Sequence, residues 1–238
     1  MLLLALACAD PAPRDSASSP GEDSAEDSQG SGLEVPLEGL GTISGACGEL
    51  DAEEWDSAQP FFFRNAIDLD AGFVVEELSS GGAQVYEDGN LGGSSIVSEV
   101  LAFELLYRCE LAELLKTEGE IVYEVEGKKT DLLADIDANT VGVSVTRAFH
   151  WPPEEDYTLE EATELLTGKL GDAAQADDNV AAEDAWSRTV LHVLAYDAQH
   201  ADQVEQAWQD LGSVGSDGVL QDFIVVVTVT DGDDTEVY

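Results

Sequence analysis

The stretch GKKTDLLADIDANTVGVSVTRA at residues 127–148 constrains the fold more than any other part of the chain. It holds two runs of apolar, strand-favouring residues, 130–137 and 140–148, and only the dipeptide Ala138-Asn139 separates them. Two strands joined by so short a turn predict an antiparallel hairpin. In the second run, the side chains of Val141, Val143 and Val145 point to one face of the strand, and those of Ser144 and Thr146 point to the other.

Charge is the second strong constraint. The chain has 238 residues with 51 acidic and 9 basic side chains, for a formal net charge of −42. A surface this negative repels nucleic acid and anionic lipid headgroups at long range. Five of the nine basic residues nevertheless fall within forty positions around the hairpin: Arg108, Lys116, Lys128, Lys129 and Arg147. Two explanations stay open: the cations help an anionic ligand to approach, or, as we favour, they neutralise crowded acids.

The other elements follow from hydrophobic periodicity and capping signals. They are a helix from Ser94 to about Lys116, a strand at 120–127, a helix from the Thr158/Glu161 capping box to Gly171, a helix from about Glu183 to Leu211, and a continuous apolar strand at 222–230. The order α-β-β-β-α-α-β predicts an α+β fold, with a mixed β-sheet and flanking helices. Residues 91–238 form this domain, and residues 33–90 are a glycine-rich, irregular β lead-in packed on it.

The N-terminus MLLLALACAD resembles the end of a bacterial lipoprotein signal, in which an apolar run precedes a cysteine that becomes lipidated. This resemblance implies that residues 1–8 are a signal segment ending at the lipidation site, Cys8. No basic residue precedes the apolar run, which departs from the usual pattern. Residues 9–32 are rich in Ser, Asp, Glu, Pro and Gly and are expected to be a disordered acidic tether. We therefore expect a domain anchored in the cell envelope, outside the cytoplasm, that contacts the membrane through its lipid alone.

Cysteine usage agrees with that location. With Cys8 assigned to the lipid, Cys47 and Cys109 remain as an even pair. In an oxidising compartment such a pair predicts one disulfide. The alternative is two buried thiols that never meet.

The element order and Asp131 together resemble the PD-(D/E)xK nuclease-like superfamily, over about residues 94–230. The resemblance implies that Asp131, at the start of the second strand, binds a divalent cation such as Mg²⁺ or Mn²⁺. It also implies an acid from the first helix as a second metal ligand. Glu104 is the candidate, because it shares the apolar face of Leu101 and would need a partner or a metal there.

The third strand departs from the superfamily pattern. Where the pattern has an acid and a lysine two residues apart, this chain has Ser144 and Thr146. A hydroxyl replaces neither a carboxylate's charge nor a lysine's cation. Lys128, Lys129 or Arg147 could supply the cation from a displaced position. The candidate catalytic residues are therefore Asp131, Lys129, Arg147 and Ser144.

Two functions remain. The first, which we favour, is a binding or structural module on a catalytically degenerate nuclease-like scaffold. The alternative is a metal-dependent nuclease or phosphodiesterase that uses Glu104 and Asp131. Net charge argues against nucleic acid as a partner without excluding it. The acidic C-terminal stretch TDGDDTEVY lacks the calcium-loop spacing and is expected to be a solvated tail. The three histidines are not spaced to bind zinc.

Overall fold

The computed structural model describes residues 34–69, 74–91, 95–152, 155–213 and 220–230. The expected lipidation site Cys8, the tether at 9–32 and residues 231–238 of the acidic tail lie outside the described residues. Within the described ranges, no helix combines the length and apolar character needed to cross a membrane.

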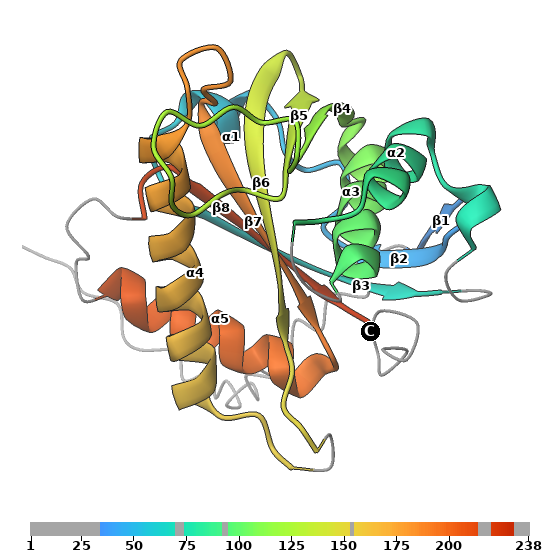
Figure 1. Cartoon of the computed structure of the whole chain (residues 1–238). Helices are drawn as coiled ribbons and strands as arrows, with labels where there is room; N and C mark the ends of the chain where they lie inside the picture. Colours follow the sequence, from blue (N-terminus) through green and yellow to red (C-terminus); the bar gives the residue numbers. More distant parts are fainter. Residues whose placement is uncertain (1–33, 70–73, 92–94, 153–154, 214–219, 231–238) are drawn as a thin grey trace, which may run out of the picture. The chain divides into compact units, whose positions relative to one another are not determined.

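The described residues are built around one eight-stranded mixed sheet with the strand order β1-β2-β3-β8-β7-β6-β5-β4 (Figure 1). The strands are β1 (Val35–Leu37), β2 (Gly41–Gly45), β3 (Phe61–Asp68), β4 (Glu113–Thr117), β5 (Leu132–Ile136), β6 (Asn139–Ala148), β7 (Arg188–Ala195) and β8 (Phe223–Val229). The four central strands β3, β8, β7 and β6 are parallel. Antiparallel pairs extend the sheet on both sides. The predicted α+β class with a mixed sheet is confirmed.

Helices cover both faces of this sheet (Figure 1). They are α1 (Ala52–Asp56), the 3₁₀ turn η1 (Val75–Glu77), α2 (Ser80–Asp88), α3 (Ile96–Glu110), α4 (Leu159–Asn179) and α5 (Ala198–Ser213). One apolar core joins α3 to one sheet face, and a second joins α4 and α5 to the other. Ile224 of β8 lies in the first core and Val225 in the second, so the predicted doubly covered strand at 222–230 is confirmed.

The hairpin is also present, since β5 pairs antiparallel with β6 from Leu132↔Val143 to Ile136↔Asn139. The strand expected at 120–127 is wrong: those residues form turns and loop, with a single bridge from Tyr123 to Val180. The strand before the hairpin is β4 instead. Helix α3 ends at Glu110, earlier than expected, because Leu111 takes a left-handed conformation with φ 55°.

The long helix expected from Glu183 to Leu211 is wrong as well. Residues 188–195 form β7, and the helix α5 begins at Ala198. Every residue of β7 is buried. A strand covered on both faces has apolar residues at successive positions, and such a run can be mistaken for one side of a helix.

The segment at 34–90 contributes more than a lead-in packed on the domain. Its strands β1, β2 and β3 belong to the sheet itself, and β3 pairs in parallel with β8 over Phe61↔Ile224 to Ala66↔Val229. The rest of this segment, with α1 and α2, packs against the same side as α3.

Candidate functional site

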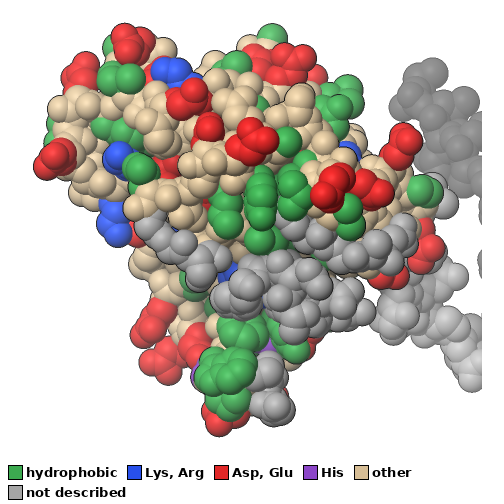
Figure 2. Space-filling model, turned by 45° about the vertical axis from the view of Figure 1, so that its right-hand side comes forward, with side chains coloured by type: hydrophobic (Ala, Val, Ile, Leu, Met, Phe, Trp, Pro, Cys, Tyr) green, Lys and Arg blue, Asp and Glu red, His purple; other side chains and the backbone are tan. Residues whose placement is uncertain are grey.

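An open cleft of about 390 Å³ lies where β6 continues beyond Leu132, the first residue of β5. Ten residues line it: Asn90, Ser95, Ser98, Glu99, Glu118, Asp131, Val145, Thr146, Arg147 and Lys169. We call this the Asp131 cleft. It collects three carboxylates and two cations from segments far apart in the sequence. On the face drawn in Figure 2, acidic side chains are more widespread than lysines and arginines.

Sheet register explains how these residues meet. Leu132 is opposite Val143, so Asp131 lies beside the part of β6 that runs on without β5. There the backbone N–H of Val145 donates a hydrogen bond of 2.6 Å to Asp131 Oδ2. Residues Val145–Ala148 still pair with β7 on their other side, which keeps this part of β6 in the sheet.

Helices and loops add the remaining groups. The start of α3 supplies Glu99, the end of β4 leads to Glu118, and α4 brings Lys169 from the second helical layer. Glu99 is 4 % exposed, and its Oε1 accepts hydrogen bonds of 2.9 Å from Asn90 Nδ2 and from Ser95 Oγ. Glu118 Oε2 accepts one of 2.8 Å from the N–H of Leu91. The loop before α3 therefore orients both acids.

The Asp131 carboxyl has an unusual proton affinity. Burial, followed by the charge of Glu99, raises the pKa of Asp131 to about 7. The hydrogen bond from Val145 and the charge of Lys169 lower it by less. A carboxyl group whose pKa is strongly raised in an open cleft is a candidate functional group.

The donor set fits a divalent cation in part. Among the described residues, no group of three His, Cys, Asp or Glu side chains is placed to hold a metal ion. Mg²⁺ commonly takes only one or two protein carboxylates and completes its shell with water and ligand phosphate. Glu99 and Asp131 would be those carboxylates, since the charge of Glu99 acts on Asp131 and both line the cleft.

Glu104, the expected helix acid, does not line this cleft. It is fully buried and forms an ion pair with Arg108, one turn later in α3. Its Oε1 also accepts hydrogen bonds from the N–H and hydroxyl of Ser79. The carboxylate of α3 that lines the cleft is Glu99. The signal for Glu99 in the sequence was its position in the first turn of α3. This signal could be interpreted only with the correct position of β4.

The four candidate catalytic residues are divided by the structure. Asp131 and Arg147 line the cleft, whereas Ser144 and Lys129 do not. The Ser144 hydroxyl is buried 3.2 Å from the Thr130 hydroxyl. Lys129 Nζ lies 5.5 Å from the centre of the Tyr123 ring. Lys169 is the site cation that sequence reasoning did not assign.

Several of the scarce cations serve the fold. Ion pairs join Arg64 to Asp202, Arg108 to Glu104, Lys116 to Asp184 and Lys128 to Asp172. Arg188 is buried and donates to backbone carbonyls, among them Glu54 O at 2.8 Å and Gln59 O at 2.7 Å. The structural explanation accounts for these residues. Arg147 and Lys169 line the Asp131 cleft, where the functional explanation would apply.

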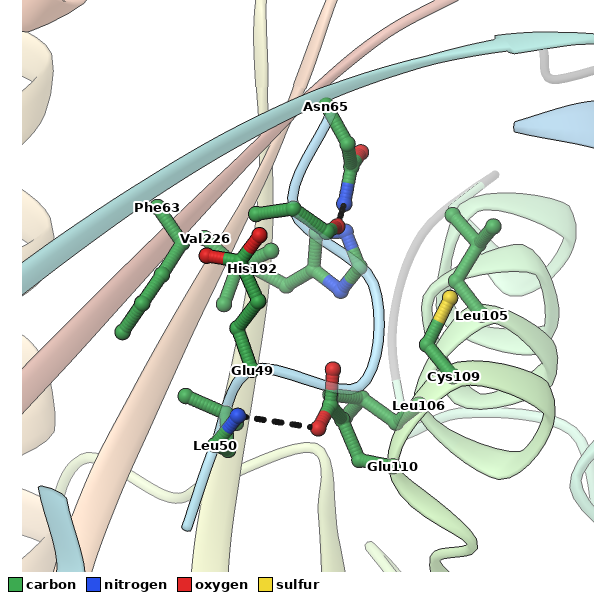
Figure 3. Close-up of a pocket in the computed structure, with 11 residues that line it drawn as sticks. Glu49, Leu50, Phe63, Asn65, Leu105, Leu106, Cys109, Glu110, His192 and Val226 are labelled. Atoms are coloured by element: carbon green, nitrogen blue, oxygen red, sulfur yellow. Dashed lines mark hydrogen bonds between the residues drawn. The ribbon is translucent and has the colours of Figure 1, made fainter. Parts of the chain in front are cut away.

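The predicted disulfide between Cys47 and Cys109 is present, with a Cα–Cα distance of 4.7 Å. Beside it, Glu110 accepts hydrogen bonds from the N–H groups of Gly48 and Leu50, which holds this loop on α3. Figure 3 shows the small cavity next to the disulfide, of about 20 Å³, with His192 on its wall. That volume suits one water molecule, so the cavity is too small for an organic ligand.

Comparisons with known proteins give one partial likeness. The chain is 36% identical over 137 residues to the "AAC-rich mRNA clone AAC4 protein" of Dictyostelium discoideum. The match covers 55% of this chain and 20% of that protein, so the chain spans about a fifth of the length of the curated relative it matches. No family model and no solved structure matches.

Proposed function

We propose that the domain is a binding module that holds a phosphate-bearing anion together with a divalent cation in the Asp131 cleft. The observation that carries the proposal is the meeting of Glu99 and Asp131 with Arg147 and Lys169 in one open cleft. In this proposal the scaffold is nuclease-like but catalytically degenerate, and a lipid on Cys8 anchors it in the cell envelope. The order α3-β4-β5-β6-α4-β7, which matches the superfamily core, supports the scaffold.

Charge makes this ligand class reasonable. A phosphate oxyanion needs local cations in a chain with a net charge of −42. The Arg147 guanidinium offers a planar fork that matches phosphate geometry, and Lys169 adds a point charge. A divalent cation between the carboxylates and the phosphate would remove their mutual repulsion. It would also stabilise the ionised form of Asp131, whose pKa burial has raised.

The third strand supports binding over catalysis. The cleft receives Thr146 from β6 where the superfamily has a charged residue, and Ser144 is engaged with Thr130 instead. A cation held here would thus lack one carboxylate that the superfamily uses. Weaker polarisation of a bound phosphodiester would follow.

The second candidate function is a metal-dependent nuclease or phosphodiesterase, and the closeness of Lys169 and Asp131 favours it. A bound metal ion would supply a Lewis acid and an activated water molecule. Glu99 and Asp131 would hold that ion, while Lys169 and Arg147 would stabilise the charge on the phosphate oxygens.

The test begins with calorimetric titration of the full-length chain with Mn²⁺ and Mg²⁺, then with inorganic phosphate in the presence of the metal. Wild type should bind both, and Asp131→Asn and Glu99→Gln should lose the metal. Asp210→Asn, in an exposed position on α5, is the matched control and should bind like wild type. Wild-type protein that binds neither metal nor phosphate would end both candidates.

Turnover separates the two candidates. Bis(p-nitrophenyl) phosphate and single- and double-stranded DNA are incubated with the chain and Mn²⁺. Binding without hydrolysis supports the binding module. Hydrolysis that Asp131→Asn abolishes and Asp210→Asn leaves intact supports the enzyme.

The anchor has its own test. The full-length chain is expressed in a Gram-negative host with radiolabelled palmitate, alongside Cys8→Ser. Label on wild type and none on Cys8→Ser is the expected result. An unlabelled wild-type chain would remove the anchor from the proposal and leave the cleft unaffected.

A further inference from the structure

Trp151 lies in the loop between β6 and α4 and is 77 % exposed. By contrast, Trp55 and Trp186 are 8 % and 9 % exposed, and Trp208 packs on the core of α4 and α5. Exposing a large apolar ring has a free-energy cost that burial would avoid. A single exposed tryptophan is thus a candidate contact for a ligand ring, provided that its neighbours favour one.

The neighbours form a row that leads to the Asp131 cleft. The ring centre of Phe149 lies 6.5 Å from that of Trp151 and 5.4 Å from that of Tyr196. Arg147 Cζ lies 5.6 Å from the Phe149 ring centre. Arg147 also lines the cleft. A ligand with its phosphate at Arg147 therefore has aromatic surface next to it.

The loop that carries Trp151 is fixed at several points. His150 Nδ1 lies 2.5 Å from Glu161 Oε1, and His150 Nε2 lies 3.4 Å from Glu155 Oε2. Glu161 closes the capping box with Thr158 at the start of α4. The N–H of Glu155 donates to the carbonyl of Pro152. These contacts present the Trp151 ring at low conformational cost.

The charge beside this row selects the kind of ring. Glu155 and Glu161 carry carboxylates that accept hydrogen bonds, and the side chain of Glu155 is 68 % exposed. Carboxylates repel the phosphates of a polynucleotide but accept hydrogen bonds from neutral hydroxyl groups. A pyranose ring offers an apolar C–H face to stack on an aromatic ring and hydroxyl groups at its edge. It matches both features.

We propose that Trp151 and Phe149 form a stacking platform for a pyranose ring, so that the ligand of the Asp131 cleft is a sugar phosphate. This inference rests on the proposed function for the phosphate end of the ligand. The sugar end depends on the aromatic row and on Glu155.

The test uses the full-length chain with Mn²⁺ and four probes in calorimetry. The probes are inorganic phosphate, N-acetylglucosamine 1-phosphate, neutral methyl N-acetylglucosaminide and thymidine 5′-monophosphate. The variants are Trp151→Ala, the conservative Trp151→Tyr, and Leu111→Ala as the control. Leu111 is 79 % exposed at the C-terminal end of α3, whereas the cleft lies at the N-terminal end.

Wild type should bind the sugar phosphate about five- to tenfold more tightly than inorganic phosphate, the gain expected from one stacked ring. Trp151→Ala should abolish that gain and leave the affinity for inorganic phosphate unchanged. Trp151→Tyr should keep most of the gain, and Leu111→Ala should behave as wild type.

Three results would overturn the platform: equal affinity for phosphate and sugar phosphate, tighter binding of the nucleotide than of the sugar phosphate, or a gain that survives Trp151→Ala. Failure of the proposed function looks different. In that case inorganic phosphate does not bind, while the neutral glycoside still binds to wild type and not to Trp151→Ala.

Discussion

The carboxylate of Glu104 accepts two hydrogen bonds from Ser79, one of 2.9 Å from its N–H and one of 2.6 Å from its hydroxyl. Ser79 is the N-cap of α2, and its hydroxyl accepts from the N–H of Gly82. Arg108 neutralises the same carboxylate. A buried acid of α3 thus fixes the start of α2, and its role in the structure is to join two helices.

Glu104→Ala should lower the free energy of unfolding by about 3–5 kcal/mol, because Arg108 and the Ser79 N–H would lose a buried partner. Urea unfolding at neutral pH measures the loss. Ser79→Ala, which removes a cap, should cost about 1 kcal/mol. Metal binding at the Asp131 cleft should persist in the folded variant. Loss of metal binding by Glu104→Ala with little loss of stability would return Glu104 to the metal site.

Asp131→Asn should stabilise the protein at alkaline pH and not at acidic pH. The folded-state pKa of Asp131 is raised to about 7 from 3.8, so ionisation costs folding free energy between about pH 4 and pH 7. The amide avoids this cost, which is on the order of 4 kcal/mol above pH 7. Chemical denaturation of both proteins at pH 4, 6 and 8 without divalent metal gives the difference. A difference independent of pH would contradict the raised pKa, and Asp210→Asn is the control.

Arg188→Ala should destabilise the domain by about 3–5 kcal/mol. The Arg188 guanidinium donates to carbonyls of the segment around α1 and of the segment entering β8, and these would lose buried donors. Arg188→Lys can replace some of these bonds and should lose less. Thermal unfolding ranks the three proteins. An Arg188→Ala variant that unfolds at the wild-type temperature would contradict the prediction. It would mean that water replaces Arg188 as the donor to those carbonyls.

Reduction of the Cys47–Cys109 disulfide should lower the free energy of unfolding by about 4 kcal/mol, since it closes a loop with a sequence separation of 62. Urea unfolding with and without reductant measures the change. The double variant Cys47→Ser/Cys109→Ser should match the reduced wild type and be insensitive to reductant. An unchanged midpoint on reduction would indicate that Glu110 alone holds the loop on α3.

Sequence patterns predicted the features that depend on local chemistry. The β5–β6 hairpin, the capping box at Thr158 and the doubly covered β8 follow from short-range signals, whereas the disulfide followed from the even number of remaining cysteines. The strand β7 was missed because Arg188, Thr189 and His192 interrupt its apolar run, whereas the run that forms β8 is almost continuously apolar.

The site was harder to predict for a related reason. Every residue of α3 from Ser98 to Leu106 is buried, so this helix has no solvent face in that stretch. A carboxylate on its apolar side, such as Glu104, therefore marks no cleft. Glu99 belongs to α3 on one face of the sheet, and Lys169 belongs to α4 on the other face. Both line the cleft beside Asp131, and only the assembled sheet brings the three residues together. No spacing along the chain records that meeting.

The parallel pair β3 and β8 has a consequence for how the chain matures. Phe61 pairs with Ile224, so β3, which is synthesised early, can pair with β8 only after nearly the whole chain has been synthesised. Until then, both β3 and β7 present open, apolar edges that invite pairing with other chains. A nascent chain of this protein is therefore at greatest risk of aggregation just before its last described strand emerges, when a chaperone has the most to protect.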